Sequence, residues 1–154
     1  MQKISYMLLA LFGFISCSAH AADSLESQFS KQFNVARSLV DLYGQEAKNR
    51  SPKSKLTAEA GRAFYIKKVS VDGNDVSCSS CHGDDPTKDG KHTETGNLIK
   101  PLAISANPDR FSDQAKVEKN FRKHCYDLYG HDCSAQDKGD YLTYLLSVEK
   151  VEKK

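Results

Sequence analysis

The stretch Cys78-Ser79-Ser80-Cys81-His82 is the most informative part of this 154-residue chain. C-x-x-C-H is the pattern to which a c-type haem is covalently attached. The two thiols add to the two vinyl groups of the porphyrin, and the histidine that follows binds the iron from one side. The pattern therefore predicts one covalently bound haem c, with Cys78 and Cys81 as thioether cysteines and His82 as the proximal iron ligand.

Other uses of two closely spaced cysteines stay open at this point. A thioredoxin-like dithiol expects a β-α-β pattern around it, but the residues on both sides here are polar and loop-like. A zinc site needs further ligands, which His124-Cys125 and His131-Cys133 could supply. An ordinary disulfide between Cys78 and Cys81 is the third alternative. Haem attachment is the favoured interpretation.

The N-terminus has the features of a secretory signal peptide. Lys3 supplies a positive charge, residues 6–15 are apolar, and Ala19-His20-Ala21 is a cleavage site of the A-x-A type. The apolar stretch is too short to span a bilayer, and Cys17 lacks the small preceding residues of a lipoprotein signal. We expect residues 1–21 to be removed and the protein to be periplasmic, without membrane insertion.

Charge and length limit the function further. The chain has 22 basic and 20 acidic residues, a net charge of +2. This small excess predicts no binding to nucleic acid or to an anionic membrane. The length after residue 21 suits one domain. We predict an N-terminal helix and linker over residues 22–56 and a monohaem cytochrome c domain over residues 57–150.

Apolar residues recur with helical spacing in four segments. The predicted helices cover residues 24–48, 57–68, 112–129 and 134–149, with Thr57, Ser112 and Ser134 as N-caps and Gly130 as a stop. Residues 83–111 contain several glycines and prolines and are predicted to be a loop, and no strand pattern stands out. The fold class is all-α, and the order of elements is that of a class I cytochrome c with an N-terminal helical extension. In that fold the helix before the haem motif crosses the last helix, here with Gly61 facing Tyr141 and Leu145.

Four cysteines remain once Cys17 leaves with the signal peptide. Cys78 and Cys81 are assigned to haem. In an oxidising compartment Cys125 and Cys133 are expected to form a disulfide, and two buried thiols are the alternative.

The candidates for the second axial ligand of the iron can be reduced by elimination. The only methionines are Met1 and Met7, and both lie in the predicted signal peptide, so His/Met ligation is excluded in the mature protein. On the third predicted helix, His124 continues the apolar stripe Val117, Phe121, Leu128. We predict His124 as the distal ligand; Asn120, one turn earlier, and an open distal position are the alternatives. His92 lies in a charged loop and is expected to be exposed to solvent.

From Gly61 to Leu146 the chain resembles the SHP-type (sphaeroides haem protein) monohaem cytochromes c. The resemblance rests on the sequences G-R-A-F at 61–64, S-C-S-S-C-H-G-D-D at 77–85, P-L-A-I-S-A-N-P-D-R-F at 101–111 and V-E-K at 117–119. A cysteine pair eight positions apart around Gly130 also matches. The N-terminal helix matches weakly.

The resemblance implies a proximal histidine and a distal asparagine that leaves the iron on reduction, which opens a site for oxygen or nitric oxide. At the position of that asparagine this chain has His124. The resemblance also implies a dihaem cytochrome c as the redox partner, often with a membrane cytochrome b. Lys100 and Arg110 flank the matching loop and are candidates to pair with the haem propionates, with solvated surface charges as the alternative. The Pro101 carbonyl is a candidate acceptor for the His82 ring N–H.

Two functions follow as hypotheses. The first is electron transfer by a haem held between His82 and His124. The second is binding of a diatomic gas, with His124 dissociating from ferrous iron. Oxygen or nitric oxide chemistry would be a catalytic variant, but we find no general acid or base in the sequence to assign to it, and we therefore do not expect an enzyme.

Overall fold

The computed structural model describes residues 19–149. Five α-helices, one 3-10 helix and two small hairpins follow one another in this part of the chain. Of the helices in this part, none combines the length and the apolar character that a membrane span requires. The predicted signal peptide falls largely on residues 1–18, which lie outside the described residues.

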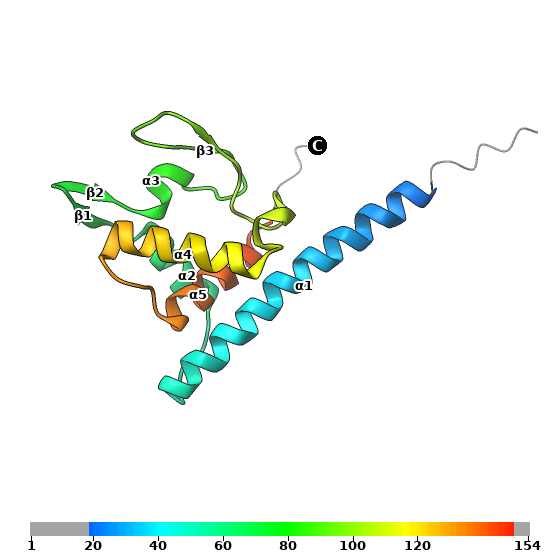
Figure 1. Cartoon of the computed structure of the whole chain (residues 1–154), viewed down its shortest axis with the longest axis horizontal. Helices are drawn as coiled ribbons and strands as arrows, with labels where there is room; N and C mark the ends of the chain where they lie inside the picture. Colours follow the sequence, from blue (N-terminus) through cyan, green and yellow to red (C-terminus); the bar gives the residue numbers. More distant parts are fainter. Residues whose placement is uncertain (1–18, 150–154) are drawn as a thin grey trace, which may run out of the picture.

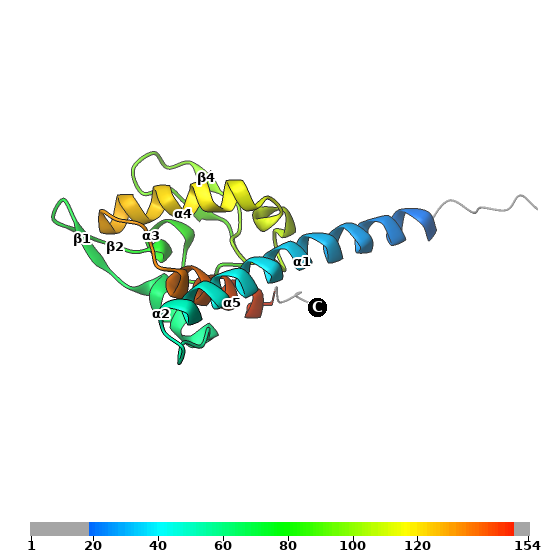
Figure 2. The same cartoon turned by 60° about the horizontal axis from the view of Figure 1, so that its bottom comes forward.

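The first helix, α1 (Ala19–Arg50), is longer than the predicted segment of residues 24–48. Its second half lies beside α5 (Ala135–Ser147), while its N-terminal turns extend away from the other elements (Figures 1 and 2). Apolar residues at helical spacing form the face that packs: Ala36, Leu39, Tyr43 and Ala47 are buried, and Val40 is partly buried against the same core.

Helix α2 (Ala58–Ile66) begins as predicted at Thr57, whose hydroxyl accepts a hydrogen bond from the Ala60 N–H at 3.1 Å. It ends at Ile66 rather than at Lys68, because the backbone becomes extended at Lys67. The predicted crossing of α2 and α5 is confirmed, and Gly61 makes it possible, but Gly61 meets Asp140 and Tyr144 rather than the predicted Tyr141 and Leu145. A Cβ atom at Gly61 would meet the backbone carbonyl of Asp140 and lie 2.7 Å from the Tyr144 Cβ.

The two hairpins were not predicted. Strand β1 (Val69–Val71) pairs with β2 (Asn74–Val76), and β3 (Gly90–Lys91) pairs with β4 (Leu98–Ile99). The first turn contains Asp72 and Gly73 with φ of 50° and 81°, the left-handed conformation that tight hairpins require. The segment predicted as a loop, residues 83–111, thus contains β3, β4 and the 3-10 helix η1 (Pro108–Phe111).

Two helices follow the loop. Helix α4 (Gln114–Tyr129) is capped by Asp113, whose carboxylate accepts from the Lys116 N–H at 3.1 Å, so the predicted cap Ser112 is wrong by one residue. Its predicted stop is confirmed, because Gly130 adopts φ 71°. Helix α5 begins at the predicted cap Ser134, which forms a reciprocal capping box with Asp137.

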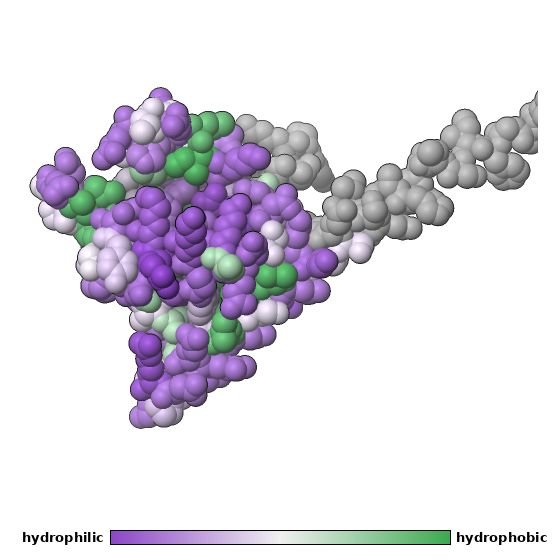
Figure 3. All heavy atoms as spheres, in the orientation of Figure 1, coloured by the Kyte–Doolittle hydropathy of each residue, from purple (hydrophilic) through white to green (hydrophobic). Residues whose placement is uncertain are grey.

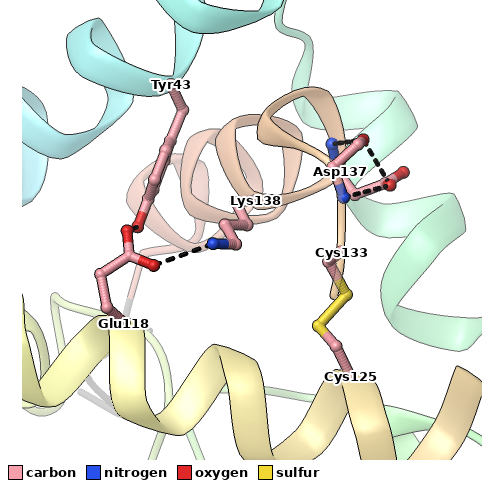
Figure 4. Close-up of polar contacts among 7 residues, drawn as sticks. Tyr43, Glu118, Cys125, Cys133, Asp137 and Lys138 are labelled. Atoms are coloured by element: carbon pink, nitrogen blue, oxygen red, sulfur yellow. Dashed lines mark hydrogen bonds and ion pairs between the residues drawn. A yellow bond between two sulfur atoms is a disulfide. The ribbon is translucent and has the colours of Figure 1, made fainter. Parts of the chain in front are cut away.

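Glu118 of α4 joins three helices (Figure 4). Its carboxylate accepts a hydrogen bond from the Tyr43 hydroxyl of α1 at 2.5 Å and one from the Lys138 ammonium of α5 at 2.8 Å. Burial alone would raise the pKa of the Glu118 carboxyl, but the hydrogen bonds from Lys138 and Tyr43 outweigh it, so the pKa lies below its usual value. The charged carboxylate is therefore the form that the fold prefers.

This network predicts an acid-sensitive contribution to stability. We expect Glu118→Gln to lower the free energy of unfolding at pH 7 by about 1 kcal/mol, a modest value because the carboxylate is partly exposed. A carboxyl with a lowered folded pKa stabilises fully above its unfolded pKa of about 4.3 and loses that contribution as the pH falls through the folded value. Urea unfolding of both proteins between pH 3 and 8 should show the difference shrinking below roughly pH 4.

The control is Glu59→Gln, because Glu59 is exposed on α2 and has no side-chain partner in the described chain. If the difference in unfolding free energy between wild type and Glu118→Gln stays constant down to pH 3, the prediction is wrong.

Candidate functional site: a cavity between two histidines

A cavity of about 470 Å³ lies between α3 (Cys78–His82), α4, α5 and the two hairpins. This volume is in the range of cofactor sites. The lining combines apolar residues with two thiols, three imidazoles and one guanidinium, and it includes Phe64, Val71, Val76, Ile99, Leu102, Val117, Phe121 and Leu128. The outer surface of α4, by contrast, is mostly hydrophilic (Figure 3).

The haem motif itself forms α3. Ser77 and Ser80 close its N-terminus with a reciprocal capping box, and Gly83 with φ 76° ends it after one and a half turns. Cys78 and Cys81 are both free thiols, so they do not form the ordinary disulfide considered above. Gly90 packs so closely behind the motif that a Cβ atom there would meet the Cys81 carbonyl and lie 2.7 Å from the His82 Cα.

His82 and His124 face each other across the cavity. Their ring centres are 6.5 Å apart, and the ring planes are nearly perpendicular, at 86°. An imidazole nitrogen binds a transition metal at about 2 Å, so two imidazoles on opposite sides of one metal have ring centres roughly 6 Å apart. The separation therefore fits one metal ion between the two rings, with the free thiols beside it for covalent attachment.

The cavity keeps both imidazoles in the form that binds metals. Burial, with the nearby charges of Arg110 and His124, lowers the pKa of His82 to about 4. His124 is an exposed residue overall, but partial desolvation of its ring lowers its pKa too, with a further contribution from Lys123. Both rings are therefore neutral at pH 7, and neutral imidazole is the metal-binding form. Burial raises the pKa of the Cys78 thiol to about 11.

The other candidate residues divide between the cavity and the surface. Asn120, the alternative distal ligand, and Arg110 line the cavity. Lys100 is exposed and is not among the lining residues. The hydrogen bond predicted from the His82 ring to the Pro101 carbonyl is not formed, and that carbonyl accepts instead from the Asn107 side-chain amide at 2.9 Å. The His82 Nδ1 is buried without a partner among the described residues.

Two cavity residues were missed or misplaced by the sequence. His92, which we expected to be exposed, is partly buried and lines the cavity. Its Nδ1 accepts from the backbone N–H groups of Glu94 and Thr95, each at 3.3 Å, which fixes the ring within the β3–β4 hairpin. Tyr141 also lines the cavity, whereas the sequence indicated it only as a residue of the crossing between the helix before the haem motif and the last helix.

Cys125 and Cys133 form the predicted disulfide, with a Cα–Cα distance of 5.6 Å (Figure 4). The bond joins the α4 residue directly after His124 to the segment just before α5. It also removes two of the thiolates that a zinc site would have used, and residues 19–149 contain no group of three or more His, Cys, Asp or Glu arranged for a metal ion.

Removing this disulfide should affect both stability and the site. We expect the Cys125→Ser/Cys133→Ser variant to lose roughly 2–3 kcal/mol of unfolding free energy, the amount expected for a short loop. Because His124 precedes the bond, its position should also loosen, which a redox titration and an optical spectrum would report. An unchanged potential and spectrum would show that the bond does not hold His124.

Comparison with known proteins agrees with the site. A family model described as a domain of unknown function (DUF1924) matches residues 51–145. Cytochrome c'' of Methylophilus methylotrophus is 37% identical over 150 residues, which is 95% of this chain and 96% of that protein. Cytochrome c-type protein SHP of Cereibacter sphaeroides is 43% identical over 105 residues, or 68% of this chain and 78% of that protein.

The solved structures of the same two relatives share the fold. Oxidised cytochrome c'' superposes with a TM-score of 0.73 at 37% identity, over 77% of this chain and 98% of that one. The solution structure of cytochrome c'', described in terms of haem-ligand detachment, superposes with a TM-score of 0.69 at 38% identity, over 77% of this chain and 97% of that one. Oxidised SHP, described as an oxygen-binding cytochrome c, superposes with a TM-score of 0.63 at 38% identity, over 71% of this chain and 94% of that one.

The fold and the cavity thus define a monohaem c-type cytochrome, with one covalently bound haem c and an all-α class I cytochrome c-like fold. The chain belongs to the family of SHP-type cytochromes c, as the resemblance implied.

Proposed function

We propose that the protein transfers electrons and that His82 and His124 hold its iron from opposite sides. The observation that carries this proposal is the 6.5 Å separation of the two rings across the cavity that Cys78 and Cys81 border. When bound, the haem supplies reversible one-electron chemistry. Two fixed imidazoles suit that role, because ligands that stay in place keep the change of geometry between oxidation states small.

The other residues of the site have supporting roles in this proposal. Cys78 and Cys81 provide the thioether bonds. Arg110, a partly buried cation in the cavity, is the better placed of the two predicted propionate partners. Neutral imidazoles on both sides should give a lower potential than His/Met ligation.

The cellular setting is also part of the proposal. The N-terminal signal pattern and the disulfide support a periplasmic location. The proposed redox partner is a dihaem cytochrome c, with or without a membrane cytochrome b. We assign no catalytic reaction.

The alternative is a gas-binding protein in which His124 leaves the metal on reduction. Two observations favour it. A structure of the relative cytochrome c'' is described in terms of haem-ligand detachment, and SHP is described as oxygen-binding. In this chain, His124 lies on α4 at the border of the cavity, whereas His82 is anchored within the covalently attached motif.

Optical spectra in both oxidation states test the two functions. Electron transfer with fixed ligands predicts low-spin spectra in the ferric and ferrous protein, and no change within minutes when carbon monoxide is added to the ferrous form. Gas binding predicts a five-coordinate ferrous spectrum and a rapid shift with carbon monoxide. A high-spin ferric spectrum would contradict the ligation by His124 on which both functions depend.

A further inference from the structure

Helix α4, which carries His124, is fastened to the rest of the domain on both sides of that residue (Figure 4). Cys125, the next residue, is covalently bound to Cys133. Glu118, six residues earlier, is bound by side chains of α1 and α5. At 1.5 Å per residue, the Glu118 attachment lies about 9 Å along the helix from His124. The ligand thus sits between one covalent and one reversible attachment.

The reversible attachment is well shielded for a charged contact. The side chains of Lys138 and Glu118 are 16% and 35% exposed, whereas the other ion pair of α4, Lys123 with Asp127, is 67% and 54% exposed. Exposed pairs stabilise little, and shielding from water strengthens a charged hydrogen bond. In the described part of the chain, the contacts of Glu118 with Tyr43 and Lys138 are the side-chain hydrogen bonds that α4 makes to other helices.

Aromatic packing connects this attachment to the cavity. The Lys138 ammonium lies 5.6 Å from the centre of the Tyr43 ring and 5.7 Å from that of Phe121. Phe121 is in edge contact with both Tyr43 and Tyr141, with ring centres 6.0 and 5.6 Å apart. Phe121 and Tyr141 both line the cavity. A change at Glu118 can therefore reach the wall of the cavity that His124 also lines.

We propose that Glu118, Tyr43 and Lys138 form a clamp that positions α4 and so determines how readily His124 leaves the metal. The proposal rests on the proposed role of His124 as the distal ligand. Since the disulfide fixes the helix after His124, movement of α4 away from the cavity requires the Glu118 end to open. The clamp residues are positioning residues, since none of them is among the cavity-lining residues.

Ligand exchange in the haem-loaded protein tests the clamp. The variants are Tyr43→Phe, which removes one hydroxyl, and Lys138→Met, which removes the charge; Lys138→Arg keeps a charged donor. Lys119→Met is the matched control, because Lys119 is exposed on α4 and has no side-chain partner within residues 19–149. We would measure the rates at which cyanide binds the ferric form and carbon monoxide binds the ferrous form, together with the reduction potential.

We expect Tyr43→Phe and Lys138→Met to bind cyanide at least about fivefold faster, a factor that corresponds to roughly 1 kcal/mol. Lys138→Arg should restore much of the wild-type rate, and Lys119→Met should equal wild type. Wild-type rates and potentials in a correctly folded Tyr43→Phe variant, judged by circular dichroism, would overturn the clamp. So would equal acceleration by Lys119→Met.

Failure of the clamp and failure of the proposed ligation give different results. If His124→Ala leaves the ferric spectrum unchanged, His124 is not the ligand, and both proposals are overturned. If His124→Ala converts the spectrum but the clamp variants exchange ligands at the wild-type rate, only the clamp is overturned.

Discussion

Replacing His124 with alanine is expected to convert the ferric haem from low-spin to high-spin and to raise the reduction potential by on the order of 100 mV. The ring of His124 lies opposite His82 at a distance that fits a shared metal. The His124 imidazole is a strong nitrogen donor that stabilises ferric iron more than ferrous iron, so its loss should raise the reduction potential. Carbon monoxide should then bind the ferrous protein at least about tenfold faster, since no ligand has to leave first. Optical and electron paramagnetic resonance spectra, a redox titration and flash photolysis would measure these effects.

The control is His131→Ala, because His131 is exposed in the disulfide loop and is not among the residues lining the cavity. It should leave spectrum and potential unchanged. A low-spin ferric spectrum retained in His124→Ala would contradict the prediction and would point to another cavity residue with a donor atom, such as Asn120, His92 or Lys123. A second substitution at each of these positions would then identify the ligand.

Much of the site could be predicted because its chemistry is local in the sequence. The thiols and the proximal histidine occur within five consecutive residues, and the absence of methionine outside the predicted signal peptide restricts the second ligand. His124 could be chosen because helical periodicity alone puts it on the face that also carries Val117 and Phe121. That face does line the cavity. No long-range information was needed for these steps.

His92 and the hairpins could not be predicted for the opposite reason. The position of His92 depends on the pairing of Gly90 with Ile99, and these strands have only two residues each. Periodicity is undetectable over so short a stretch, and the surrounding charges suggested a solvated loop. Asp72 and Gly73 are residue types typical of turns, but strands of three residues give no detectable pattern on either side.

The wrong helix cap has a similarly simple cause. Ser112 and Asp113 are adjacent, and both residue types are good N-caps. The choice between them is made by η1, since the Ser112 hydroxyl is already bonded to the Asp109 carbonyl at 2.9 Å. Sequence reasoning could place the start of α4 within one residue, and the preceding turn decided the rest.

Gly61→Ala is expected to destabilise the protein severely, by about 3 kcal/mol or more. A Cβ atom at this position would collide with the Asp140 backbone carbonyl and the Tyr144 Cβ of α5, and neither can move without separating the two helices. Tyr65 and Tyr141 pack at the same crossing, and Tyr141 lines the cavity. Thermal unfolding should show a large loss of stability, and the optical spectrum should report a disturbed haem site.

Gly44→Ala is the matched control, because Gly44 also lies inside a helix. A Cβ atom there would be 3.3 Å from the Leu56 Cδ1, the end of a flexible side chain that can give way. Alanine also favours the helical state over glycine by about 1 kcal/mol, so this variant should be neutral or slightly stabilised. Alanine should gain the same helix propensity at Gly61. A severe loss of stability in Gly61→Ala would therefore come from the collision between α2 and α5, which has to exceed this gain. Equal stability of the two variants would mean that α2 and α5 can separate at little cost in free energy. The crossing would then not be what holds Tyr141 in the cavity wall.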